Sequence, residues 1–268
     1  MNPESLLKDL KSIARAAGEE ILAIYADEEK FQRVDFKAND SPLTLADQAA
    51  HNVIVAKLAE ITPDIPVLSE EGRDIPYSER SQWTQFWLVD PLDGTKEFIK
   101  RNGEFTVNIA LVENGNVIMG CVHVPVLNTT YSAAKGLGAF VEREGEAETK
   151  IQVADFSMTD KGLRIVCSRS HMSADVEQYV SQFDAPETVS MGSSLKLVLV
   201  AEGKADIYPR LGPTMEWDTA AAQVVVEQAG GTVINHETGA PLTYNKENLL
   251  NPYFIVFANK QESADPVS

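Results

Sequence analysis

The sequence has 268 residues, of which 40 are acidic and 23 are basic, so its formal net charge at pH 7 is −17. This charge argues against a nucleic-acid groove or an anionic membrane surface as the main binding partner. Hydrophobic residues make up 44% of the chain, which excludes a disordered acidic tail. The length suits one large domain or two packed domains.

The two cysteines, Cys121 and Cys167, are not part of a CxxC pair, so the sequence indicates neither a disulfide framework nor a thiolate metal site. The N-terminus lacks a basic stretch followed by an apolar one, and no apolar run is long enough to cross a bilayer. We therefore expect a cytoplasmic protein without an integral membrane segment. Peripheral attachment to the cytoplasmic face of the inner membrane and homodimer formation are left open.

Two helices are predicted in the first quarter of the chain. Apolar residues at three- and four-residue steps follow Asn2 and Pro3, which suit the N-cap and first turn of a helix. A second helix is predicted from about Leu45 to Ile61, with Thr44 as its N-cap and Pro63 closing it.

Strands are predicted in the middle of the chain. The apolar run 86–89 stops at Asp90-Pro91, so we expect a buried strand that ends in a turn and carries Asp90 to its edge. Residues 105–112 and 117–126 are rich in β-formers and flank Asn114-Gly115, which is a strong hairpin signal. These two segments are predicted to form an antiparallel pair.

A change of pattern near residue 150 suggests two domains, residues 1–150 and 151–268. The stretch 142–150 is polar and charged, and helices and strands alternate beyond it. Strands are expected at 164–167 and 205–208, and helices at 193–202 and 219–229, with Gly230-Gly231 ending the last helix.

Acidic residues gather at the ends of predicted elements, where a hard divalent cation would find oxygen ligands. Asp90 and Asp93 flank a Pro-Leu pair and can point into one pocket, with the Leu92 carbonyl between them. Glu70 belongs to an acidic pair before a glycine, and Asp218 follows a tryptophan. This arrangement indicates a Mg²⁺ site.

Gly94 and Thr95 follow directly and are predicted to open a helix. A glycine in this place lets backbone N–H groups approach an anion. Because a protein of charge −17 should repel a phosphorylated ligand, bound cations are needed to invert the local field. The sequence therefore predicts metal first and phosphate second, in one loop.

Each carboxylate also has a purely structural interpretation. Asp218 before Thr219 would be a good N-cap, and Asp47, three residues after Thr44, could complete a capping box. Glu70 could belong to a solvated acidic pair, and residues 90–94 are all compatible with a simple turn. The residues alone leave these alternatives open.

Other chemistries find less support in the sequence. The glycines at 136 and 138 favour a plain turn over a nucleotide loop, because neither a third glycine nor a P-loop lysine follows at the required spacing. The four histidines show no metal-ligand spacing. Gly192-Ser193-Ser194 does not match a nucleophile elbow, so catalysis by a serine nucleophile is disfavoured.

Three motifs together resemble the signatures of the lithium-sensitive inositol monophosphatase superfamily in order and spacing. They are Ser69-Glu70-Glu71-Gly72, Asp90-Pro91-Leu92-Asp93-Gly94-Thr95 and Trp217-Asp218. Lys96-Glu97-Phe98 and the segments 208–210, 212–214 and 217–221 resemble the bacterial branch of 3′(2′),5′-bisphosphate nucleotidases. The resemblance extends over most of the chain.

The resemblance implies an α/β (α+β) protein with the layered α-β-α-β-α sugar-phosphatase fold. It implies a small phosphorylated nucleotide as partner and hydrolysis of the 3′-phosphate of adenosine 3′,5′-bisphosphate to AMP and phosphate. Two or three Mg²⁺ ions would be required, and Li⁺ should inhibit. Carried over by position, the metal ligands would be Glu70, Asp90, the Leu92 carbonyl, Asp93 and Asp218.

The same resemblance assigns catalytic and binding roles. Asp47 and Thr95, with Glu70, would orient and help deprotonate the attacking water. Gly94 and Thr95 would hold the scissile phosphate, and Arg210 would bind the distal phosphate, since a guanidinium can do so bidentately. The remaining candidates for contact with the nucleotide are His171, Gly192, Ser193, Ser194, Lys196 and Asp218.

Two other functions stay open from the sequence. An inositol monophosphatase or a sugar bisphosphatase would use the same metals and the same fold on another alcohol. A non-catalytic regulator that binds metal or nucleotide would have no need of Asp47 and Thr95.

Overall fold

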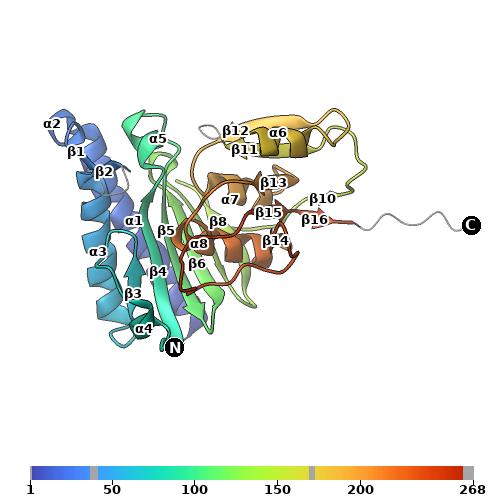
Figure 1. The fold of residues 1–268 in the computed structure, drawn as a ribbon. Helices are drawn as coiled ribbons and strands as arrows, with labels where there is room; N and C mark the ends of the chain where they lie inside the picture. The colour runs from blue at the N-terminus through green and yellow to red at the C-terminus, as the bar shows by residue number, and fades with distance from the viewer. Residues whose placement is uncertain (1, 37–41, 169–172, 262–268) are drawn as a thin grey trace, which may run out of the picture.

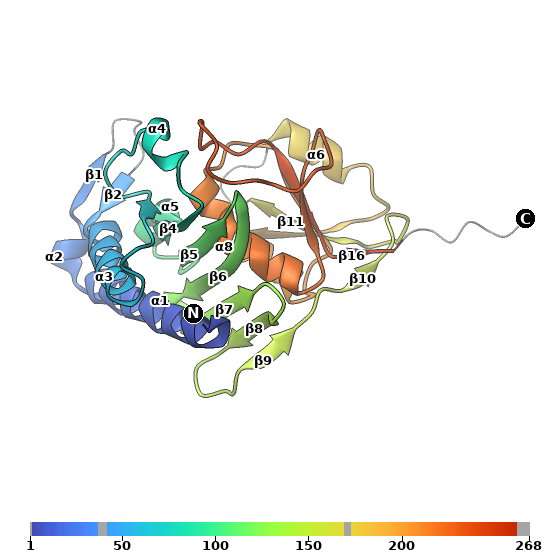
Figure 2. The same cartoon turned by 90° about the horizontal axis from the view of Figure 1, so that it is seen from below.

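The computed structural model describes residues 2–36, 42–168 and 173–261. Two β-sheets lie face to face with helices on both outer sides and between them (Figures 1 and 2). The helices are α1 (Pro3–Ala26), α2 (Glu28–Phe31), α3 (Leu45–Ile61), α4 (Tyr77–Arg80), α5 (Thr95–Ile99), α6 (Ala174–Val180), α7 (Leu195–Ala201) and α8 (Glu216–Gln228), with the 3-10 turn η1 (Pro125–Leu127).

The larger sheet has seven strands in the order of the chain, parallel only between its first two. They are β3 (Val67–Ser69), β4 (Gln85–Asp93), β5 (Thr106–Glu113), β6 (Asn116–Val124), β7 (Thr129–Ala134), β8 (Gly138–Glu142) and β9 (Thr149–Ile151). The smaller sheet has the order β12 (Glu187–Met191), β11 (Arg164–Ser168), β13 (Ile207–Arg210), β15 (Phe254–Phe257) and β14 (Thr232–Asn235). Two short pairs join β1 (Val34–Phe36) to β2 (Pro42–Thr44) and β10 (Asp155–Phe156) to β16 (Asn259–Lys260).

The layers follow from which helices cover which sheet. Helices α1 and α3 pack together on the outer face of the larger sheet, and α8 lies against its inner face. Helix α7 packs between α8 and the smaller sheet, and α6 contacts β13. The order α-β-α-β-α confirms the predicted fold. The larger sheet ends at β9, close to residue 150, while α8 from the second half packs against both sheets, so the division into two domains stays a prediction.

Local signals placed several elements correctly. The Asn2 side chain accepts a hydrogen bond from the Glu4 N–H (3.0 Å) at the start of α1, and α3 has the predicted bounds. The β5–β6 hairpin turns through Asn114 (φ 48°) and Gly115 (φ 76°), a pair of positive φ angles that suits the twist of antiparallel strands.

Two predicted boundaries were wrong. Strand β4 continues through Pro91 to Asp93. The pairing of β4 with β5 is irregular between Asp90 and Asp93, so Pro91, which has no backbone N–H, need not donate a hydrogen bond to β5 there. Helix α8 begins three residues before the expected Thr219, so Asp218 is not its N-cap; it lies at the third helical position and accepts a hydrogen bond from the Met215 N–H (2.8 Å). The other strands and helices differ from their expected bounds by a few residues.

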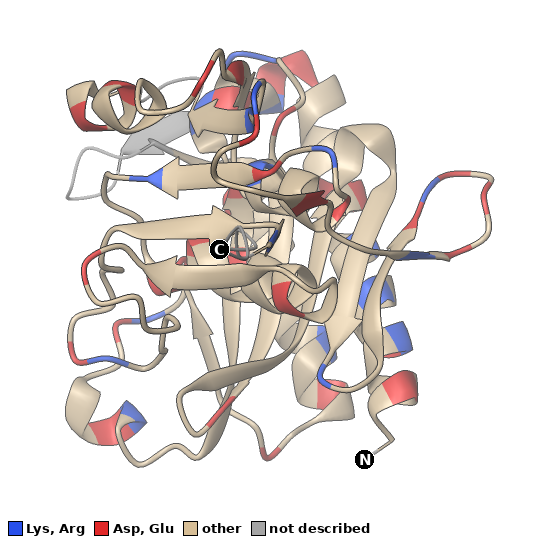
Figure 3. Cartoon of the chain, turned by 90° about the vertical axis from the view of Figure 1, so that its right-hand side faces the viewer, with Lys and Arg blue, Asp and Glu red and all other residues tan. Residues whose placement is uncertain are grey.

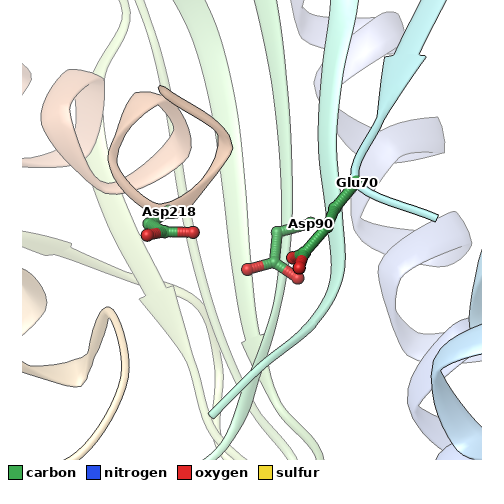
Figure 4. A group of neighbouring side chains, drawn as sticks. All are labelled: Glu70, Asp90 and Asp218. Atoms are coloured by element: carbon green, nitrogen blue, oxygen red, sulfur yellow. The ribbon is translucent and has the colours of Figure 1, made fainter. Parts of the chain in front are cut away.

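Helix α8 sits very close to the larger sheet at one glycine. A Cβ atom on Gly120 would lie 2.6 Å from both the Ala221 carbonyl oxygen and Val224 Cγ1. The absence of a side chain at Gly120 therefore lets α8 approach β6. The first turn of α8 lies beside the end of β4 that carries Asp90 (Figure 4).

Charged residues are spread over the loops and helices seen in Figure 3, with basic positions interspersed among acidic ones. Among the described residues, no helix combines the length and apolar character that a membrane span requires.

A buried histidine makes stability depend on pH. His123 is 3% exposed, contacts Thr130 Oγ1 through Nδ1 (3.0 Å), and has a pKa lowered to about 4 by burial and by the nearby Arg15 charge. Because its unfolded pKa is higher, the unfolded chain binds the extra proton, and the stabilisation is complete above about pH 6.5 and lost progressively toward pH 4.

We therefore expect the free energy of unfolding to fall by about 2 kcal/mol less in His123→Gln than in the parent protein when the pH falls from 7 to 5. Urea unfolding at the two pH values measures both free energies. Parallel losses in the two proteins would show that His123 does not contribute to the acid sensitivity.

Candidate active site

Three carboxylates from different elements converge beside the end of the larger sheet (Figure 4). Glu70 follows β3, Asp90 lies in β4, and Asp218 lies in the first turn of α8. One oxygen of each lies within 4.8 Å of the corresponding oxygens of the other two. The three ligands on offer are therefore all hard oxygen atoms held at a separation that a cation can bridge.

The electrostatics of this cluster favour a bound cation. Asp90 is 1% exposed, and burial together with the charges of Glu70, Asp93, Asp218 and Asp47 raises its pKa well above the usual range. The pKa of Asp218 is raised by burial and by the charges of Asp93 and Glu70. A divalent cation would offset both the desolvation and the mutual repulsion, so the residues present fit such an ion.

Asp93 joins this cluster to the second half of the chain. Burial raises its pKa to about 6, while the Lys196 charge and the Ser194 N–H act in the opposite direction. The Ser194 N–H donates to Asp93 Oδ2 (2.6 Å), and the Ser194 hydroxyl donates to Asn108 Oδ1 (2.9 Å) and contacts Thr106 Oγ1 (2.8 Å). Ser194 is 1% exposed and so ties the start of α7 to β5 and Asp93.

Asp47 and Thr95 meet near the carboxylates, since the Asp47 charge acts on Asp90. Asp47 Oδ2 accepts hydrogen bonds from the Thr44 N–H (2.7 Å) and hydroxyl (2.6 Å), which is the capping box that the sequence allowed. Its second oxygen, Oδ1, lies 3.2 Å from the Thr95 hydroxyl, which also lies 3.4 Å from the Leu92 carbonyl. The capping role and a role toward Thr95 are therefore compatible, since they use different oxygens.

A cleft beside the carboxylates carries two cationic side chains. Burial lowers the pKa of Lys196 to about 8, and its ammonium donates to the Ser193 carbonyl (2.5 Å) and lies 5.7 Å from the centre of the Tyr208 ring. The Arg210 guanidinium donates to the Pro213 carbonyl (2.8 Å). The cleft is lined by Asp93, Gly94, Glu97, Ser168, Gly192, Ser193, Ser194, Lys196, Leu197, Tyr208, Arg210, Thr214, Asp218, Thr219 and Phe254.

The loops that form this cleft touch at two glycines. A Cβ atom on Gly192 would lie 2.7 Å from Glu97 Cγ and 2.9 Å from the Glu104 carbonyl oxygen, and Gly94 has φ 94°. Glycine at these places lets the loop before α7 and the loop before α5 share one small space.

Comparison with known proteins shows the family of this chain. The model of the inositol monophosphatase family matches residues 2–263, which is nearly the whole chain. The chain belongs to the inositol monophosphatase family.

Individual members of the inositol monophosphatase family are similar over their full lengths. The 3′(2′),5′-bisphosphate nucleotidase CysQ of Escherichia coli (strain K12) is 50% identical over 253 residues, covering 94% of this chain and 99% of that protein. The CysQ of Haemophilus influenzae is 36% identical over 259 residues, covering 96% and 94%. The crystal structure of CysQ from Bacteroides thetaiotaomicron superposes with a TM-score of 0.85 at 44% identity, covering 97% of this chain and 99% of that one.

The structure gathers most of the predicted site residues of this inositol monophosphatase family member into one region. The metal candidates and the Asp47–Thr95 pair lie at the end of the larger sheet. Of the described substrate candidates, all except Thr95 line the cleft. His171 lies outside the described residues. The individual roles stay predictions.

Sequence reasoning missed three polar residues of the site. Glu97 is 7% exposed in the cleft, Asn108 accepts from Ser194 and pairs in register with Asp90, and Glu104 Oε2 accepts from the Gly192 N–H (2.8 Å). The position of Glu97 three residues after Gly94 could have indicated a place on the same helical side. The other two depend on strand and loop pairing, which no local motif carries.

Proposed function

We propose that this protein is a Mg²⁺-dependent phosphatase that hydrolyses the 3′-phosphate of adenosine 3′,5′-bisphosphate to AMP and phosphate. The observation that carries this proposal is a cleft lined by two cations, Lys196 and Arg210, which shares Asp218 with the carboxylate cluster. The carboxylates suit metal ions at the scissile phosphate, and the cations suit a second phosphate. The 50% identity to the E. coli CysQ nucleotidase supports the same substrate.

Five residues would hold the metal. Glu70, Asp90, Asp93 and Asp218 would offer carboxylate oxygens and Leu92 its carbonyl oxygen, to two or three Mg²⁺ ions. Bound Mg²⁺ would supply a lowered water pKa and would offset the charge of the phosphate. Li⁺ should inhibit.

The side chains of the protein would position water and move its proton. Asp47 Oδ1 would accept the proton of the attacking water, because its other oxygen is occupied by Thr44. The Thr95 hydroxyl, 3.2 Å from that oxygen, would orient the water. Attack on phosphorus then breaks the bond to the 3′-oxygen, which takes up a proton and leaves as the hydroxyl of AMP.

On the substrate side, Gly94 and Thr95 would bind the scissile phosphate and Arg210 the 5′-phosphate. Gly192, Ser193, Ser194, Lys196 and Asp218 would contribute to the nucleotide site. The free, buried Cys121 and Cys167 support a reducing, cytoplasmic location, and homodimer formation stays a prediction.

Phosphate release from adenosine 3′,5′-bisphosphate, inositol 1-phosphate and fructose 1,6-bisphosphate, measured side by side, tests the proposal. We expect release from the nucleotide that requires Mg²⁺, stops with chelator and falls with Li⁺. Preference for inositol or fructose phosphate would refute the substrate assignment but keep the phosphatase mechanism. No release from any substrate would favour a binding protein.

The position of Arg210 predicts a change in substrate affinity. Arg210→Gln should raise the KM for adenosine 3′,5′-bisphosphate by about tenfold or more, because it removes a charge-assisted contact, while kcat changes less. The KM of Arg210→Lys should lie between those of the parent protein and Arg210→Gln, since lysine keeps the charge but cannot bind the phosphate bidentately. The exposed Arg73→Gln serves as the control. An unchanged KM in Arg210→Gln would show that another group binds the 5′-phosphate.

A further inference from the structure

A segment far along the chain crosses the first turn of α8. We call this segment, residues 244–251, the strap. The Glu216 N–H donates to the Leu249 carbonyl (2.9 Å), and the Asn251 N–H donates to the Thr214 carbonyl (2.8 Å). The Asn251 side-chain amide donates to the Met215 carbonyl (2.8 Å) and to Thr219 Oγ1 (3.0 Å). The strap therefore holds the backbone before Asp218 and the side chain of Thr219 after it.

Glu216 is the most deeply buried link between the strap and α8. Its side chain is 0% exposed. Oε2 accepts from the Asn245 N–H (2.6 Å), and Oε1 accepts from the Lys246 N–H (3.0 Å) and ammonium (2.6 Å). A buried carboxylate with three donors fixes a geometry, because losing any donor leaves a desolvated charge.

The strap is also tied to the side of the molecule that carries Glu70. Arg80 in α4 is 4% exposed, and its guanidinium donates to Asn245 Oδ1 (3.0 Å) and to the carbonyls of Lys246 (2.6 Å) and Glu247 (2.7 Å). The Asn245 side-chain amide donates back to the Arg80 carbonyl (2.7 Å). Helix α4 follows Glu70 in the chain, so the strap joins α8 to the segment between Glu70 and β4.

We propose that Glu216, acting through the strap, is a positioning residue that keeps Asp218 within reach of Glu70 and Asp90 for metal binding. Asp218 accepts from the Met215 N–H, next to Glu216, so the anchored backbone leads directly to its carboxylate. Three like charges within 4.8 Å repel one another, and the first turn of α8 would move away without an anchor. The inference rests on the proposed metal site.

Calorimetric titration with Mg²⁺ alone, at a temperature where each protein is folded, tests this role. Glu216→Gln keeps the size but sets an amide N–H₂ against a backbone donor, so we expect Mg²⁺ to bind about tenfold more weakly. Turnover should recover at high Mg²⁺, which a purely structural defect would not do.

Glu202→Gln is the matched control. Glu202 is also a buried carboxylate, 3% exposed, and it pairs with Arg143 and Lys204 at the end of α7. The Glu202→Gln protein should lose stability without a change in Mg²⁺ affinity. Should Glu216→Gln fail to fold, Lys246→Met removes the ammonium and leaves both backbone donors, and a smaller weakening is expected.

The outcomes distinguish a failure of the role of Glu216 from a failure of the proposed function. Equal Mg²⁺ affinity in the parent protein and Glu216→Gln, or equal weakening in Glu216→Gln and Glu202→Gln, would overturn the role of Glu216 and leave the metal site intact. Absence of Mg²⁺ binding in the parent protein would overturn the proposed function, and the role of Glu216 with it.

Discussion

Asp90→Asn should lower phosphatase turnover by about 10³-fold and, in the presence of chelator, raise the melting temperature. Asp90 is 1% exposed and its pKa is raised by burial and by neighbouring carboxylates, so at neutral pH its charge destabilises the metal-free fold. Asparagine keeps the shape and the acceptor for the Leu92 N–H (3.1 Å). We expect a rise of roughly 2–4 °C for each kcal/mol recovered.

The loss of turnover has the same origin. If Asp90 holds metal ions, the variant loses several kcal/mol of transition-state stabilisation, or about 10³-fold in rate, and Mg²⁺ no longer raises its melting temperature. The measurements are thermal melts with chelator and with Mg²⁺, together with phosphate release.

Asp206→Asn is a matched control with the opposite expectation. Asp206 is also buried, but it pairs with Arg164 and accepts the Arg164 N–H (2.8 Å) at the far end of β13 from Arg210. Its variant should melt lower and keep both turnover and the response to Mg²⁺. An Asp90→Asn protein that melts at a lower temperature than the parent protein in chelator, or that stays active, would contradict the assignment of Asp90 as a metal ligand.

The sequence predicted those parts of the fold that short-range chemistry determines. The caps at Asn2 and Thr44 and the Asn114-Gly115 turn each act within a few residues, and their elements lie where expected. The start of α8 was misplaced because the strap contributes to it, and the Leu249 carbonyl that receives the Glu216 N–H lies more than thirty residues away. No pattern near Asp218 carries that information.

The candidate site shows the same division. Asp90 and Asp93 could be grouped from spacing alone, since both lie within the last four residues of β4. Glu70 and Asp218 lie on other elements; their places at element ends made them candidate ligands, the family resemblance assigned them to the same site, and the structure brings them together. Asn108 was missed because its proximity to Asp90 follows from the register between β4 and β5.

Asp47→Asn should lower turnover by about 10²- to 10⁴-fold while leaving Mg²⁺ affinity largely intact. Asparagine can still accept the Thr44 N–H, but it is not a base, so the proton of the attacking water has no acceptor at Oδ1 beside Thr95. Phosphate release and calorimetric Mg²⁺ titration measure the two effects separately.

Thr44→Val distinguishes catalysis from helix capping. It removes the hydroxyl that donates to Asp47 Oδ2 (2.6 Å) and caps the Ala46 N–H (3.2 Å), so it should cost about 1 kcal/mol of stability. Because Asp47 keeps its charge and its Oδ1, turnover should fall far less than in Asp47→Asn. Equal losses in both variants would mean that Asp47 acts through the helix start, and near-normal turnover in Asp47→Asn would exclude it as the base.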